Sequence, residues 1–405
     1  MSKKLSFLLG FSLYIPYRFL GDRAGAISFT LTDLVVVLYL IYIIIKMLAR
    51  KSIKLDVDFV LKFKFVFFMT VIIFLINYIA SEQSTYYRSM TKELILAFIL
   101  YITLNIDVFL FKSDIKKYIL YGFLFSGLSN SLLSIAQNFN ENLYIQKSNI
   151  LSYKVNLYGE VINNPIIGFF AHTNSNAYMI ILCLIVCMYI FKNKLIKLIC
   201  ISINIIALYG TQSKGAFILC IIVLCAYFIL RNRKKLALKY KLITIFSILQ
   251  IYLLYLMSLI KNIPELGTFK DRILFQYSFI KLISENPIIL IIGNGTSKME
   301  LYTSKYARYS LIYSHASFLD NILFLGIIGI IINYLIFNRY FRLFKISDKF
   351  KNSDLLIMLI LMILTMIYVS FIEPMYMTQP TTYILAILLF NAEQVFSKNK
   401  KQKEV

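Results

Sequence analysis

Long runs of apolar residues separated by short polar segments cover most of this 405-residue chain. Each run approaches the roughly 20 residues that an α-helix needs to cross the hydrocarbon core of a bilayer. Twelve runs fit this description: 5–20, 29–48, 59–80, 92–111, 117–137, 172–191, 195–210, 215–231, 242–260, 315–338, 354–373 and 380–396. The pattern predicts an all-α integral membrane protein with about 12 transmembrane helices, forming a single polytopic domain over residues 1–405.

Basic residues cluster between the apolar runs and give the chain a net charge of +23. If the N-terminus is cytoplasmic, every segment on the cytoplasmic side carries Lys or Arg, as the positive-inside rule requires. We therefore expect both termini in the cytoplasm, and the charge needs no nucleic-acid partner. With 59% hydrophobic and 16% charged residues, a water-soluble globular fold is excluded.

Two predicted outside loops, about 138–171 and 261–314, are much longer than the other connections. Loops of this length are usually functional or disordered. The second contains Thr268-Phe269-Lys270-Asp271, which resembles a helix-capping box. Apolar residues then recur at helical spacing: Ile273, Leu274, Tyr277, Ile280 and Ile283. The loop therefore predicts a short amphipathic helix that starts near Arg272 and lies along the membrane surface.

The only two histidines, His172 and His315, both fall at outer ends of predicted spans. Imidazole has the proton affinity of a general base near neutral pH, although a hydrogen-bonded interfacial histidine is the alternative. Gly168 allows a turn before His172, and Asn174 follows at the top of the helix. Asn174 is a candidate for substrate binding or, together with Thr173, for simple helix capping.

Two cations are candidates for binding a phosphate group. Lys214 lies in the tight outside turn Thr211-Gln212-Ser213-Lys214, at the N-terminus of the next helix, where free backbone N–H groups favour anions. Arg272 lies in the long loop, and a guanidinium can grip a phosphate in bidentate fashion. The alternative for each is an ordinary solvated charge.

Asp320 and Asn321 lie inside an apolar run, where polar groups usually face a cavity or a partner. Hydrogen bonding between helices is the alternative for both. Glu373 ends another run and is expected either to line an outer cavity or to face water. Gly326 and Gly329 predict a close helix contact. The five cysteines lie inside apolar segments without metal-site or disulfide spacing, so we expect them to be small apolar fillers. We expect no metal site and no cofactor.

The order of these motifs resembles a known group. Gly-Phe-Phe-x-His-x-Asn comes first, then a short Ser-Lys-Gly-Ala turn, a long outside loop with Gly-x-Gly, and His-x-Ser-Phe-Leu…Leu-Gly-Ile-Ile-Gly. This order is similar to that of the bacterial O-antigen ligase and O-antigen polymerase (Wzy-type) superfamily, by motif over roughly 165–340 and by topology over the whole chain. The resemblance implies a metal-independent, GT-C-like glycosyltransferase of the plasma membrane.

The resemblance also implies roles for single residues. His315 matches a loop histidine that activates the acceptor hydroxyl, and Arg272 matches a loop arginine that binds the lipid diphosphate. Lys214 stands where the superfamily usually has Arg, which gives a point charge instead of a fork. The remaining candidates, expected to bind substrate, are His172, Asn174, Asp320 and Glu373.

The predicted function is the polymerisation of undecaprenyl-diphosphate-linked oligosaccharide repeat units into O-antigen or capsular polysaccharide on the outer face of the membrane. An O-antigen ligase, which transfers the glycan to lipid A core or to a protein, is the first alternative. A polysaccharide transporter or flippase is the second, and a structural partner in an envelope assembly is the third. The expected partners are the lipid-linked oligosaccharide and membrane lipid, with a flippase and a chain-length regulator as further candidates.

Overall fold

The computed structural model describes most of the predicted spans. The described residues are 2–15, 18–20, 29–49, 85–111, 114–140, 143, 166–170, 173–231, 267–293, 296–307, 311, 314, 316–327, 329–331, 333–334, 338, 354–372, 382–384, 386–388 and 390–391. The predicted spans 59–80 and 242–260 lie outside them.

The described chain is mostly helical, as predicted. Its elements are α1 (Ser2–Ser12), β1 (Arg18–Leu20), β2 (Phe29–Thr30), α2 (Leu31–Leu48), α4 (Thr85–Phe111), α5 (Lys116–Gln137), α7 (Thr173–Ile190), α8 (Lys194–Gly210), α9 (Lys214–Arg231), α11 (Gly267–Glu285), α12 (Ile289–Ile292), α13 (Thr296–Tyr306), α14 (Ser317–Leu325) and α16 (Asp354–Ile372). Among the described residues, α2, α5 and α7 are long and apolar enough to cross a membrane, and shorter apolar helices lie within α4, α9 and α16. The count of twelve and the GT-C-like architecture stay predictions.

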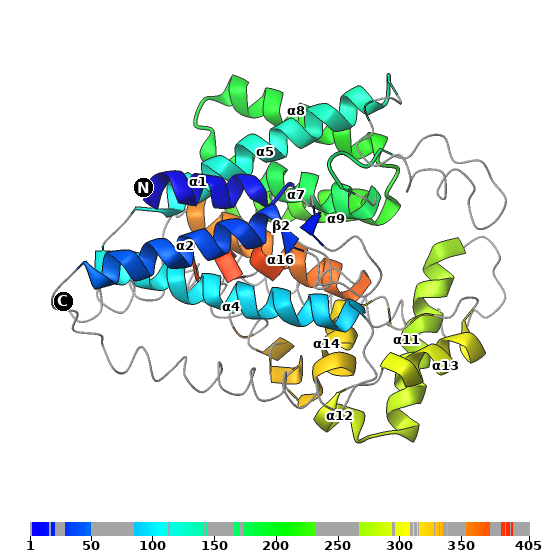
Figure 1. Cartoon of the computed structure of the whole chain (residues 1–405). Helices are drawn as coiled ribbons and strands as arrows, with labels where there is room; N and C mark the ends of the chain where they lie inside the picture. Colours follow the sequence, from blue (N-terminus) through cyan, green and yellow to red (C-terminus); the bar gives the residue numbers. More distant parts are fainter. Residues whose placement is uncertain are drawn as a thin grey trace.

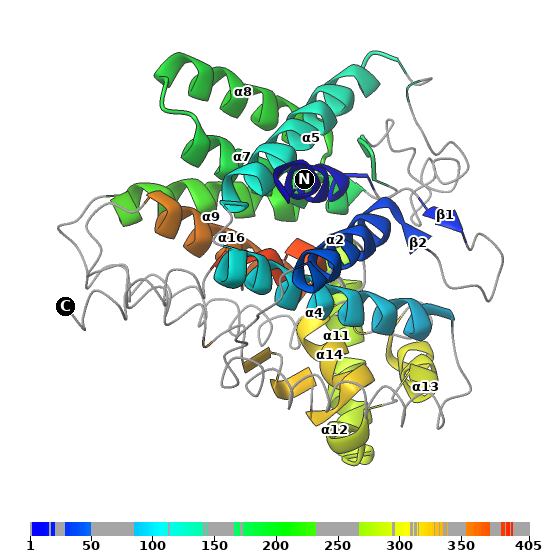
Figure 2. The same ribbon diagram turned by 60° about the vertical axis from the view of Figure 1, so that its left-hand side comes forward.

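Helix α7 forms the centre of the bundle. Its side chains from Asn176 to Met188 are all buried, as expected for a helix that is apolar all round. Helices α5, α8, α9 and α16 contact it, and Figures 1 and 2 show them grouped around it. By contrast, α2 has a row of exposed large apolar side chains, which suits contact with lipid.

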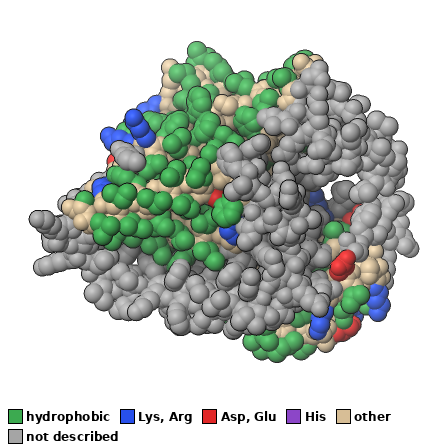
Figure 3. All heavy atoms as spheres, in the orientation of Figure 1, with side chains coloured by type: hydrophobic (Ala, Val, Ile, Leu, Met, Phe, Trp, Pro, Cys, Tyr) green, Lys and Arg blue, Asp and Glu red, His purple; other side chains and the backbone are tan. Residues whose placement is uncertain are grey.

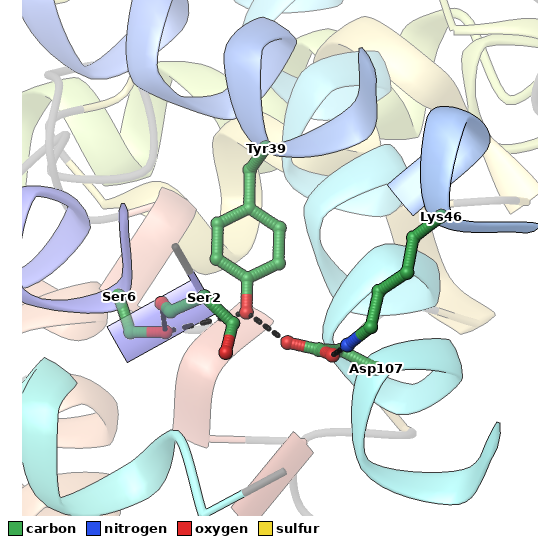
Figure 4. A network of polar contacts seen from close by, with 5 residues as sticks. All are labelled: Ser2, Ser6, Tyr39, Lys46 and Asp107. Atoms are coloured by element: carbon green, nitrogen blue, oxygen red, sulfur yellow. Dashed lines mark hydrogen bonds and ion pairs between the residues drawn. The ribbon is translucent and has the colours of Figure 1, made fainter. Parts of the chain in front are cut away.

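Two buried carboxylates join α2 to α4 at their opposite ends. Near the N-terminal ends, Lys92 Nζ lies 2.6 Å from Asp33 Oδ2, and near the C-terminal ends, Lys46 Nζ lies 3.3 Å from Asp107 Oδ1. Tyr39 donates a 2.6 Å hydrogen bond to Asp107 as well (Figure 4). The two helices therefore run parallel, which is the relation that the predicted order of crossings requires.

Close packing of α1 against α5 depends on glycine. A Cβ on Gly10 would lie 2.0 Å from the carbonyl oxygen of Ile119. A Cβ on Gly122 would lie 2.0 Å from the carbonyl oxygen of Phe7. Small residues at such positions let membrane helices approach closely.

The first predicted span, 5–20, is wrong in its second half. Helix α1 ends at Ser12, and Arg18–Leu20 forms the strand β1, which pairs antiparallel with β2. Pro16 has no backbone N–H and disfavours a helical residue before it, so a helix could not continue through this position. The fold is therefore not purely α-helical.

The tenth predicted span, 315–338, is not one continuous helix. Helix α14 ends at Leu325; the next residue, Gly326, has a φ of +56°, and a helical segment begins again at Ile327. Asn333 Nδ2 donates a 2.8 Å hydrogen bond to the Phe318 carbonyl. In a straight helix these two residues would lie about 22 Å apart, so the chain reverses at Gly326. A Cβ on Gly329 would lie 2.0 Å from the Asn321 carbonyl oxygen, which confirms the predicted close helix contact.

The described part of the long loop forms three helices, α11, α12 and α13, where one was predicted. Helix α11 begins at Gly267, about a turn before the predicted start near Arg272, and Thr268 lies inside it. The predicted apolar face is right in part, because Ile273 is buried and Ile283 packs against the apolar cluster. Ile280, however, is 60% exposed, and Phe275, Phe279 and Leu282 are buried in addition. Phe279 and Leu282 pack with residues of α12, α13 and α14 into one small apolar cluster.

Helices α11 and α13 lie beside the bundle, and α11 runs across the direction of α2 and α4 (Figures 1 and 2). Tyr302 of α13 donates a hydrogen bond to the Glu285 carboxylate of α11, and this bond raises the pKa of Tyr302. In Figure 3, apolar side chains predominate on the described surface of the bundle, whereas the lobe formed by α11 and α13 shows several charged side chains. The lobe thus has the surface of a part that contacts water.

Candidate functional site

The segment 166–170, just before the predicted His172–Asn174 block, is held by buried amide side chains of α5. Gly168 has a φ of +57°, and a Cβ there would lie 2.3 Å from Asn130 Oδ1. Its N–H donates to Gln137 Oε1 at 2.9 Å, and Gln137 Nε2 donates back to its carbonyl at 3.1 Å. Phe169 N donates to Asn130 Oδ1 at 2.8 Å. Gly168 therefore does allow the turn and close approach that the sequence predicted.

Asn176 of α7 completes this network. Asn130 Nδ2 donates to Asn176 Oδ1 at 2.8 Å, and Asn176 Nδ2 donates to Ser134 Oγ at 3.1 Å. Buried amides with all partners satisfied make a rigid support. The network thus fixes where the chain enters α7, although residue 172 itself lies outside the described residues.

Sequence reasoning missed Asn130, Ser134 and Gln137, yet a signal was present. Together with Ser126, these residues recur at spacings of three and four in an otherwise apolar run. That spacing places them on one face of a helix. A polar stripe on a membrane-spanning helix indicates a partner or a cavity.

The turn between α8 and α9 lies directly against the N-terminal end of α7. Ser213 Oγ donates a 2.8 Å hydrogen bond to Asn174 Oδ1. Gln212 has a φ of +55°, a left-handed conformation that is uncommon for residues other than glycine. Lys214 is the first residue of α9, and its side chain is not among those described. The structure therefore brings Asn174 and the backbone of the Lys214 turn together.

A second connection reaches the same turn from α11. Tyr368 of α16 donates a 3.4 Å hydrogen bond to the carbonyl of Gly215, which follows Lys214. Arg272 of α11 lies close enough to the Tyr368 hydroxyl to interact with it electrostatically. Asn174 and the Lys214 backbone therefore meet at the N-terminal end of α9, and Tyr368 of α16 bonds the same turn, although these residues lie far apart in the sequence.

Asp320 holds the turn that flanks position 315. Its side chain is 0% exposed, and its Oδ1 accepts a 2.6 Å hydrogen bond from the Ser314 backbone N–H. Ser314 Oγ in turn lies 3.3 Å from both the N and the O of Ala316. Asp320 Oδ2 has no hydrogen-bond partner among the described residues. Asp320, which was predicted to bind substrate, thus contacts the backbone next to position 315 through Ser314.

The Gly-x-Gly motif of the long loop meets the break after α14. Gly293 has a φ of +79°, and a Cβ there would lie 2.4 Å from the Phe324 carbonyl oxygen. A Cβ on Gly326 would lie 2.6 Å from Gly293 N. Because neither position has room for a side chain, these two glycines let α12 lock against the end of α14.

Three predicted site residues, His172, His315 and Glu373, lie outside the described residues. Asn321 bonds Asn333 at 2.9 Å, which is the hydrogen bonding between helices that was the alternative to a site role. Within the described part of the chain, no group of three or more His, Cys, Asp or Glu side chains could hold a metal ion.

The chain was also compared with known proteins. Residues 198–334 match the family model described as O-antigen ligase. The predicted resemblance to the O-antigen ligase and polymerase superfamily is confirmed for this segment, which contains the α8–α9 turn, α11 and α14. It indicates a membrane protein with ligase-type or polymerase-type glycosyltransferase activity that acts on lipid-linked oligosaccharide. No curated protein matches the chain.

Proposed function

We propose that this protein is a polysaccharide polymerase on the outer face of the bacterial plasma membrane, which joins undecaprenyl-diphosphate-linked repeat units. In the reaction, an acceptor hydroxyl oxygen bonds to the anomeric carbon of the donor glycan. The bond from that carbon to the lipid diphosphate breaks, and the diphosphate leaves with the electron pair. The hydroxyl proton passes to a base, and the configuration at the sugar is inverted.

The observation that carries this proposal is the grouping around the N-terminal end of α9. Ser213 links the turn to Asn174, Tyr368 bonds the carbonyl of Gly215, and the charge of Arg272 acts on the same Tyr368 hydroxyl. A helix N-terminus with its free N–H groups favours an anion. Lys214 and Arg272 would add positive charge that stabilises the departing diphosphate as the anomeric bond breaks.

In this proposal His315 is the base that accepts the proton of the acceptor hydroxyl. Asp320 is a positioning residue, because its carboxylate accepts a hydrogen bond from the backbone N–H of Ser314, the residue before His315. His172, Asn174 and Glu373 are assigned to contacts with the sugars. Metal independence and the plasma-membrane location belong to the same proposal.

The test is complementation of a deletion strain, followed by gel separation of its surface glycans. The wild-type gene should restore long chains. His315→Ala should leave mostly single-repeat material, because removal of a general base lowers rates by about 10²–10⁴-fold. Arg272→Ala and Lys214→Ala should shorten the chains as well.

The matched control is Lys281→Ala, which removes a cation from the same helix as Arg272. Lys281 stacks on Tyr277 within α11, with its Nζ 5.8 Å from the ring centroid, so its loss should leave the glycan pattern unchanged. If the His315, Arg272 and Lys214 variants insert at wild-type levels and still make long chains, the proposal is wrong.

The second candidate is an O-antigen ligase, and the description of the matching family model favours it. A ligase transfers the finished glycan to lipid A core or to a protein. The same deletion strain separates the two activities. Loss of a polymerase leaves single repeats, whereas loss of a ligase leaves long chains on the lipid carrier.

A further inference from the structure

A groove of about 650 Å³ opens beside the α8–α9 turn. Its walls come from the end of α5, the end of α8, the turn and the first part of α9. Six of the lining residues carry the argument: Asn138, Phe139, Tyr209, Gln212, Ser213 and Phe217. Gly210 also lines it, and a Cβ there would lie 2.3 Å from Ile166 Cδ1, so glycine lets α8 end against the fixed 166–170 segment.

The groove presents aromatic rings together with polar groups. Phe139 is 86% exposed and Tyr209 is 75% exposed. Tyr209 and Phe217 pack edge to face with their ring centroids 6.3 Å apart. Asn138 and Gln212 add amides, each of which can both donate and accept hydrogen bonds. Rings with amides beside them match a ligand that has apolar C–H faces and hydroxyl edges, which is the chemistry of a sugar.

The groove is continuous with the proposed site. Ser213 lines it and also bonds Asn174 at 2.8 Å, and Lys214 is the next residue. Gln212, which has a left-handed backbone conformation, also lines the groove and directly precedes Ser213 in the sequence. Unusual backbone of this kind is often found at binding sites. A glycan whose diphosphate lies at the N-terminal end of α9 could therefore extend its sugars along this groove.

We infer that this groove is an oligosaccharide-binding subsite, which holds the sugar units next to the transferred bond. The inference rests on the proposed function, because it places the glycan of the same substrate. A polyprenyl chain is the competing occupant. The amides of Asn138 and Gln212 argue against it, since burying them under a hydrocarbon chain would leave polar groups without hydrogen bonds.

The experiment measures binding of a sugar without its lipid. The full-length protein in lipid nanodiscs is titrated with the delipidated repeat-unit oligosaccharide released from the host's surface polysaccharide by mild acid. Tyr209→Ala should raise Kd roughly tenfold, the effect expected for loss of one stacking ring. Gln212→Ala should raise Kd by a smaller factor, whereas Tyr209→Phe, which keeps the ring, should bind like the wild type.

The matched control is Phe228→Ala, because Phe228 is another exposed aromatic residue of α9, near its opposite end. Its loss should leave sugar binding unchanged. A second titration uses farnesyl diphosphate as a short polyprenyl probe. If Tyr209→Ala weakens only this probe, or if neither groove variant changes the Kd for the sugar, the subsite assignment is overturned.

This result is separable from the fate of the proposed function, because binding needs no transfer. If a deletion strain keeps normal surface glycans while Tyr209→Ala loses sugar binding, the proposed polymerase is wrong and the subsite stands. If the deletion strain stops at single repeats while Tyr209→Ala binds sugar normally, the polymerase stands and the subsite is wrong.

Discussion

Asp33 and Asp320 are both fully buried carboxylates of the described chain, and their surroundings differ. In the α2–α4 pair, Asp33 is paired with Lys92 at 2.6 Å and also accepts hydrogen bonds from Thr30 N and the Tyr383 hydroxyl. In the α14 region, Asp320 is equally buried, yet its Oδ1 accepts a backbone N–H and its Oδ2 has no partner among the described residues.

The difference distinguishes a structural charge from a candidate functional one. A buried ion pair with every lone pair satisfied holds helices in register, and the loss of one partner leaves an uncompensated charge. A buried carboxylate without a cation or a full set of donors is costly to fold, and such costs are often retained at functional sites. The contrast therefore predicts stability effects at Asp33 and activity effects at Asp320.

The largest effect should follow Asp33→Ala. Lys92 would lose its partner in a buried position, so the free energy of unfolding should fall by about 3–5 kcal/mol. Equilibrium unfolding of the purified protein in mixed micelles measures this change. Asp33→Asn keeps an acceptor for Thr30 and should cost less. A stable Asp33→Ala protein that has lost activity would contradict the prediction that Asp33 acts on stability and Asp320 on activity.

Asp320→Ala should act on turnover first. The Ser314 N–H would lose its acceptor and the turn that flanks His315 would shift, and misplacement of about 1 Å costs on the order of 10²-fold in rate. Glycan elongation per folded molecule is the readout. Asp320→Asn keeps an oxygen for Ser314 and should retain most of the rate. Equal loss in both variants would mean that the negative charge itself is required.

Gly168→Ala should have a smaller effect on the fold. A Cβ would be strained at φ +57° and would lie too close to Asn130 Oδ1, and such backbone strain and overpacking cost about 1–3 kcal/mol. Thermal unfolding measures the loss. Gly215→Ala is the matched control, since a Cβ there meets only the Tyr178 hydroxyl, at 3.5 Å.

The smallest effect should follow Ser213→Ala, which removes one side-chain hydrogen bond to Asn174. The expected cost is about 1 kcal/mol of stability. If the turn positions the substrate, activity should fall more than stability does. Asn174→Ala should lower activity and stability by the same amounts. If the double mutant loses no further activity or stability, the two residues act as a pair.

The sequence by itself determined the class of the protein and most of its helices. The ends of α2, α5, α7, α8 and α9 agree with the predicted apolar runs to within about two residues, because the length of such a run is set by the thickness of the bilayer. The superfamily was also recognisable from the order of short motifs, which needs no knowledge of contacts.

Only the tertiary structure decided which polar residues meet. The reversal at Gly326 depends on Gly293 and Asn333, and the link from Arg272 to the α9 turn passes through Tyr368 of another helix. The apolar face of α11 was predicted only in part, since which side is buried depends on α12, α13 and α14. Hydropathy along a chain records burial from water, but it carries no information on partners that are distant in sequence and adjacent in space.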